Sequence, residues 1–134
     1  MKNEFVPYEL ALELKQLGFD EPCIAHFRGF DCEPTCQMGF DFKFEKNSEF
    51  GNSNYWIARP TFSTAFRWFR EKHNIDGLLH KTVEGSYYFW ITECEYENYN
   101  HYKYYNQMVY FNTYEKAELE CLIKLIEIIK NGTK

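Results

Sequence analysis

The chain has 134 residues, of which 45% are hydrophobic and 26% charged, a balance typical of a globular domain and not of a disordered protein. Its net charge of −5 argues against a protein that binds the nucleic-acid backbone without selectivity. No apolar run approaches the roughly 20 residues that a membrane helix needs. Aromatic residues make up 20% of the chain, far above ordinary usage.

The N-terminal sequence MKNEFVPYEL lacks a basic segment followed by an apolar one, so it does not predict a secretory signal. The five cysteines form an odd set: Cys23, Cys32, Cys36, Cys94 and Cys121. Without a signal we interpret them as reduced thiols, and we expect a cytoplasmic protein with no membrane segment.

Helical periodicity marks the first two helices. In PYELALELKQLGFD the leucines recur at helical spacing, Pro7 suits the first turn and Gly18 suits the position just past the end. These features predict a helix over residues 7–17. In PTFSTAFRWFREKHNIDG, Thr61 can cap a second helix and Gly77 is expected to mark its exit.

A third helix is expected in NTYEKAELECLIKLIEIIKNG, which ends naturally at Gly132. Two residues could cap it. Asn112 would form a capping box with Glu115, three residues later, and the neighbouring Thr113 is the alternative cap. Its continuous polar stripe consists of Lys116, Glu120, Lys124 and Glu127. Apolar residues cover the remaining broad side, so this helix is either mostly buried or forms a homodimer with a second chain.

Strands are expected between the helices. EPCIAHFRGF, MGFDFKFEKN and YWIAR supply the first group, and in the second of these the rings from Phe40 to Phe44 alternate with charged residues, as in a half-buried antiparallel strand. LLHKTVEGSYYFWITECE predicts two strands around Glu84 and Gly85, and YKYYNQMVYF a further one. The order helix, strands, helix, strands, helix predicts an α+β fold, an antiparallel sheet packed by three helices, as a single domain over residues 1–134.

Three stretches resemble a known family: NEFVPYELALELKQLGFDEPC, PTFSTAFRWFREKH and TYEKAELECLIKLIEIIKN, at residues 3–23, 60–73 and 113–131. They are similar to a group of short uncharacterised proteins carried by phages and prophages of Bacteroidetes. The resemblance covers about 54 residues, mainly on the three expected helices. It implies a phage or prophage setting inside a bacterial cell, and it implies no activity, cofactor or site residue.

The tyrosine-rich stretch from Ser86 to Glu115 holds nine tyrosines in thirty residues. Strand alternation sends Tyr88 and Trp90 to one side, and Phe89 to the other. Farther on, rings are interleaved with amide side chains, and rigid rings beside adaptable amides are typical of recognition surfaces. An ordinary tyrosine-rich strand is the competing interpretation. The candidate partner-binding residues are Tyr88, Trp90, Tyr96, Tyr99, Tyr102, Tyr104 and Tyr105.

Three arginines support an alternative. Arg59, Arg67 and Arg70 could hold phosphate or carboxylate bidentately, with tryptophan or tyrosine rings stacking on a base. A solvated helix face with ordinary ion pairs is the competing and preferred interpretation for these side chains. The functional version would be a protein that binds or sequesters a nucleotide or a signalling nucleotide.

Metal binding has weak support. Cys32 and Cys36 could offer thiolates to zinc, with Cys23 or His26 completing the set, but the spacing lacks a second close cysteine pair. We therefore expect buried or surface thiols and no metal or cofactor.

The alternating carboxylates Glu93, Glu95 and Glu97 would share one face of a strand. They could hold a cation or receive a basic partner, but charges that protect an edge strand from aggregation are the better interpretation.

Catalytic motifs are missing from the sequence: no metalloprotease helix, nucleophile elbow, phosphate-binding glycine loop or dinucleotide fingerprint is present. The sequence therefore favours a non-enzymatic interaction protein of phage or prophage type. We expect it to bind a host or viral protein through the tyrosine-rich surface, as an inhibitor or adaptor, for example against host defence. Nucleic acid is not the expected partner.

Overall fold

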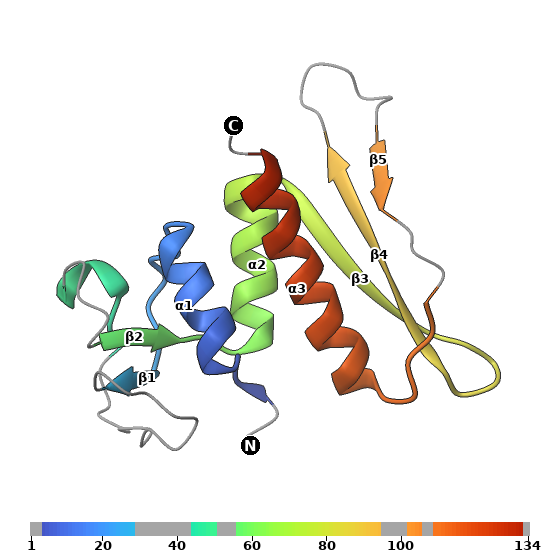
Figure 1. Ribbon diagram of the computed structural model, residues 1–134, viewed down its shortest axis with the longest axis horizontal. Coiled ribbons are helices and arrows are strands. Elements are labelled where there is room, and N and C mark those ends of the chain that lie inside the picture. The colour runs from blue at the N-terminus through green and yellow to red at the C-terminus, as the bar shows by residue number, and fades with distance from the viewer. Residues whose placement is uncertain (1–3, 29–43, 51–55, 95–101, 106–108, 133–134) are drawn as a thin grey trace. The chain divides into compact units, whose positions relative to one another are not determined.

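The computed structural model describes residues 4–28, 44–50, 56–94, 102–105 and 109–132, with the backbone alone at 28, 50, 94 and 102–105. Its element order is helix, strands, helix, strands, helix (Figure 1), and the predicted α+β class is confirmed. Among the described residues the strands form two antiparallel sheets, one of two strands and one of three. The chain divides into two compact units, residues 1–65 and 66–134. The single domain stays a prediction.

The first unit contains α1 (Tyr8–Gln16), β1 (Ala25–Arg28), the 3-10 turn η2 (Asn47–Phe50) and β2 (Trp56–Arg59). β1 and β2 pair in antiparallel register, with Ala25 opposite Arg59, and α1 packs against β2. The predicted strand MGFDFKFEKN lies mostly outside the described residues. Of it, Phe44 is exposed, and Glu45 forms an isolated bridge with Cys23.

α1 ends as its sequence predicts. Gly18 takes a positive φ of 94° just past the helix, where a side chain would be strained. Its amide donates to Lys15 O at 3.0 Å, and the Phe19 amide donates to Leu14 O at 2.9 Å. These two hydrogen bonds satisfy carbonyl groups of the last turn. The buried side chains of Phe19 and Leu14 accompany them, as is common where a glycine ends a helix.

α2 (Phe62–His73) begins as predicted and ends earlier than predicted. Thr61 Oγ1 accepts the Thr64 amide at 3.2 Å, which confirms the cap. The prediction that Gly77 marks the exit is wrong. The helix stops at His73, Asn74 takes the left-handed conformation with φ 59°, and Gly77 lies inside a strand. Asparagine tolerates this conformation better than most residues, so it can end the helix in place of glycine.

The second unit is built on a three-stranded sheet of β3 (Ile75–Lys81), β4 (Tyr87–Cys94) and β5 (Tyr102–Tyr105), in the order β3-β4-β5. The β3–β4 hairpin confirms the predicted turn around Glu84 and Gly85. The Thr82 amide donates to Ser86 O at 2.8 Å, the Ser86 amide donates to Thr82 Oγ1 at 3.0 Å, and Gly85 has a φ of 91°. A left-handed glycine at this position is typical of a three-residue hairpin loop.

α3 (Tyr114–Gly132) packs along the hairpin, against β3 and β4 (Figure 1). Its buried residues are Ala117, Cys121, Leu122, Leu125 and Ile126. Of the two predicted caps, Thr113 is the one in place, because its Oγ1 accepts the Lys116 amide at 3.2 Å. Within the described residues, no helix is long and apolar enough to cross a membrane.

Candidate functional site

β4 presents different residues on its two faces, as its sequence alternation predicts. Phe89 and Ile91 point toward the interior, where they are 8% and 0% exposed. Trp90, between them, is 39% exposed, and Tyr88 is partly exposed. One set of rings therefore belongs to the core under α3, and the other set lies on the opposite face of the sheet.

The hairpin register brings β3 residues beside the outward rings of β4. Leu78 lies opposite Trp90, and His80 lies opposite Tyr88. Directly opposite residues of antiparallel strands point to the same face, so these four side chains share one surface. The backbone of Phe111 forms an isolated antiparallel bridge with that of Tyr87 in β4.

The rings on this surface contact one another. His80 stacks on Tyr88, with ring centroids 5.1 Å apart and an interplanar angle of 20°, and its centroid lies 5.6 Å from that of Trp90. Tyr110 meets Tyr88 edge-on at 5.9 Å. The surface, here named the aromatic face, consists of Leu78, His80, Tyr88, Trp90 and Tyr110.

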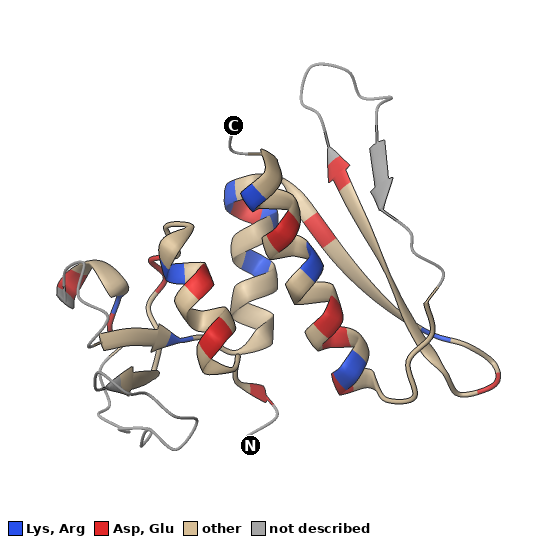
Figure 2. Ribbon diagram, in the orientation of Figure 1, with Lys and Arg blue, Asp and Glu red and all other residues tan. Residues whose placement is uncertain are grey.

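The aromatic face is poor in charge. Figure 2 shows that the ribbon of β3 and β4 is mostly uncharged between its ends. Asp76, near the start of β3, pairs with Arg70 at 3.6 Å between Oδ1 and Nη1. His80 Nε2 is covered by its neighbours and has no hydrogen-bond partner among the described residues. Dispersion contacts and ring stacking are the interactions this surface offers.

The structure places the predicted partner-binding residues unevenly. Tyr88 and Trp90 belong to the aromatic face. Tyr102, Tyr104 and Tyr105 lie on β5, and the backbone register sets Tyr104 opposite Thr92 of β4. Tyr96 and Tyr99 lie outside the described residues.

Three residues of the aromatic face were not predicted: Leu78, His80 and Tyr110. The hairpin supplies a signal that could have found two of them. Once a three-residue loop is centred on Glu84, the pairing of His80 with Tyr88 and of Leu78 with Trp90 follows by counting. Tyr110 depends on a long-range bridge that no local pattern indicates.

Arg59, in the first unit, is engaged by its neighbours. Its Nε donates to Val6 O at 3.2 Å, and its guanidinium carbon lies 5.4 Å from the Phe5 ring centroid and 4.9 Å from that of Phe27. Burial lowers the pKa of this guanidinium from its usual value. Such contacts are typical of an arginine that stabilises the fold.

Arg67 and Arg70 belong to the second unit. Both side chains are exposed, and Arg70 of α2 forms an ion pair with Asp76 of β3. Neither is held in a closed site by the contacts described, so their arrangement resembles an ordinary solvated helix face.

Cys23 and Cys121, the two cysteines whose side chains the structure describes, are buried free thiols. Burial, followed by the nearby Glu21 charge, raises the pKa of the Cys23 thiol to about 12, and its Sγ donates to Glu21 O at 3.4 Å. Burial, followed by the charges of Asp76 and Glu118, raises the pKa of the Cys121 thiol further. Cys32, Cys36, Glu95 and Glu97 lie outside the described residues. Among the residues that are described, no three candidate ligands come together.

Comparisons of the chain with protein-family models, with curated proteins and with solved structures find no match.

Proposed function

We propose that the protein is a non-enzymatic interaction protein that binds a protein partner through the aromatic face. One observation carries this proposal. Tyr88, Trp90 and His80 form a contiguous, partly exposed cluster of rings on the face of the sheet that α3 does not cover. Rings of this kind bury a large area while losing few rotamers, so they are enriched at the centres of protein interfaces.

The low charge of the surface favours a protein partner over a nucleotide. A phosphate group needs convergent cations, and Arg59 already contacts Phe5, Phe27 and the Val6 carbonyl. The nucleotide-binding alternative therefore has less support than the interaction protein.

The sequence resemblance to phage and prophage proteins supports a setting for this interaction. In that setting the protein acts in the cytoplasm of a bacterial host, as an inhibitor or adaptor of a host or viral protein.

The test uses capture from a Bacteroidetes host lysate by the immobilised full chain. The variants are Trp90→Ser and Tyr88→Ser, and the control is Val83→Ser, which removes an exposed apolar side chain from the turn of the same hairpin. We expect a protein captured by the wild type and by the control to be lost with both aromatic variants. Capture that is equal for all four proteins would contradict the proposal.

Intrinsic fluorescence gives a second readout for a partner captured in this way. Trp56 and Trp68 are 3% and 4% exposed, whereas Trp90 is 39% exposed. Covering Trp90 should shift tryptophan emission to shorter wavelength, and the shift should be absent from Trp90→Ser. An identical shift in that variant would place the interaction elsewhere.

A further inference from the structure

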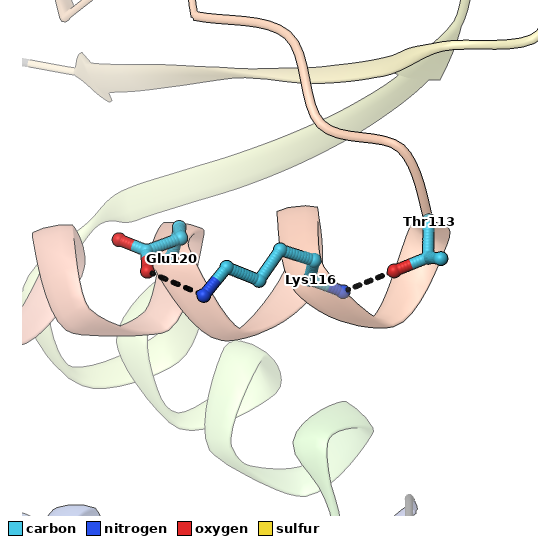
Figure 3. Close-up of polar contacts among 3 residues, drawn as sticks. All are labelled: Thr113, Lys116 and Glu120. Atoms are coloured by element: carbon cyan, nitrogen blue, oxygen red, sulfur yellow. Dashed lines mark hydrogen bonds and ion pairs between the residues drawn. The ribbon is translucent and has the colours of Figure 1, made fainter.

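One partly exposed side of α3, part of which borders a groove, has a regular order of charge. Along it stand Lys116, Glu120, Lys124 and Glu127. Lys116 pairs with Glu120 at 3.6 Å within the helix (Figure 3), and Lys124 pairs with Glu127 at 3.1 Å. These are i,i+4 and i,i+3 pairs, which contribute little to stability in water.

The order of signs is complementary to itself when the helix is reversed. Read forward it is lysine, glutamate, lysine, glutamate, and read backward it is glutamate, lysine, glutamate, lysine. In an antiparallel pair of α3 helices related by a two-fold axis that passes between Glu120 and Ile123, Lys116 would stand opposite Glu127 of the partner subunit. Glu120 would stand opposite Lys124 of the partner subunit, and a two-fold axis makes each of these contacts twice.

Apolar groups adjoin the charges. Ile123 is 37% exposed in the middle of the face, and Leu119 is partly exposed beside it. A groove of about 460 Å³ lies between α3 and the segment leading into it, and its apolar walls are Phe89, Val109, Phe111 and Ile123. A second helix on this face would remove some of this apolar surface from water, which favours association.

We infer that α3 is the interface of a homodimer, formed by antiparallel packing of this face against a second copy of the chain. The occupant is assigned by charge: a parallel two-fold pair would set like charges opposite each other, whereas in an antiparallel pair the same four charges of the two copies match. Because α3 packs on the inner face of the β3–β4 hairpin, the dimer leaves each aromatic face uncovered by this contact. This inference does not depend on the proposed function, and it adds that a partner would meet two aromatic faces per particle.

The experiment measures the mass of the full chain by sedimentation equilibrium across a wide concentration range. The wild type should show a monomer–dimer equilibrium, and Lys124→Glu should weaken it by about tenfold or more because like charges then face each other. The control is Lys72→Glu, an equal change of charge on the exposed side of α2, which should leave the equilibrium unchanged.

The double variant Glu120→Lys with Lys124→Glu tests the register. It exchanges the two charges, so an antiparallel pair regains both contacts and dimerisation should return toward the wild-type level. Circular dichroism confirms that each variant keeps its helices. A wild type that remains monomeric at every concentration would overturn the inference, and so would a double variant as weak as Lys124→Glu.

Discussion

Gly77 of β3 lies directly against Cys121 of α3. A Cβ atom placed on residue 77 would stand 2.6 Å from Cys121 Sγ and 3.0 Å from Phe66 Cε1. This close approach explains why a glycine occupies a strand interior, where it otherwise weakens the structure. The missing side chain lets β3 pass close to the helix.

Substituting this glycine should disturb the packing between β3 and α3. We expect Gly77→Ala to lower the free energy of unfolding by about 1–3 kcal/mol, because the added methyl overpacks a buried contact. The measurement is urea denaturation followed by far-UV circular dichroism. Adding Cys121→Ala removes the obstructing sulfur and should recover at least about 0.5 kcal/mol of that loss. An equal loss in both backgrounds would show that Cys121 is not the obstacle.

Truncation of the neighbouring residues Phe89 and Trp90 should lower the free energy of unfolding by very different amounts. Phe89→Ala empties a core position and is expected to cost about 3–5 kcal/mol. Trp90→Ala removes a larger ring from the aromatic face, and we expect a loss below about 1.5 kcal/mol, the scale of its ring contacts. Unfolding curves of the two variants measure this difference. Similar losses for both would be inconsistent with the register of β4.

Arg59 and Arg67 also form a matched pair. Arg59→Ala removes a hydrogen bond to Val6 O and two ring contacts, so we expect a loss of about 1–3 kcal/mol in the free energy of unfolding. Arg67→Ala changes an exposed side chain and should stay within about 0.5 kcal/mol of the wild type. Thermal unfolding compares them. If Arg59→Ala proved neutral, its guanidinium would be free for another role.

The cap of α3 can be tested by two adjacent substitutions. Thr113→Ala removes the acceptor of the Lys116 amide and should cost about 1 kcal/mol. Asn112→Ala should change the free energy of unfolding by less than about 0.5 kcal/mol, since Asn112 is exposed and precedes the cap. The reverse ranking in chemical denaturation would favour the capping box that begins at Asn112.

Glu118 should make stability depend on pH. Burial, followed by the Glu115 charge, raises its pKa from the usual value of 4.5. A carboxyl whose pKa is higher in the folded state loses stability as pH rises through the window between its unfolded and folded pKa. Glu118→Gln should therefore unfold at a higher temperature than the wild type at neutral pH. The advantage should vanish below pH of about 4, where the unfolded glutamate is also protonated. A pH-independent difference would assign the effect to packing instead.

The local features of this protein follow from its sequence. The end of α1 at Gly18, the cap at Thr61 and the alternation of Phe89 with Trp90 were all predicted, and all are confirmed. Each depends on residues a few positions apart, where backbone preference and the period of a helix or strand determine the outcome. The same periods gave the α+β class and the element order.

Other features were decided only by tertiary structure. By local rules a glycine commonly ends a helix. Gly77 instead lies within β3, where the close approach of Cys121 leaves no room for a side chain. Tyr110 joins Tyr88 only through pairing across a longer segment of chain. Such contacts depend on which strands meet and in which register. The free energy that selects them comes from burying Phe89, Ile91 and the apolar face of α3 together, which no short window of sequence contains.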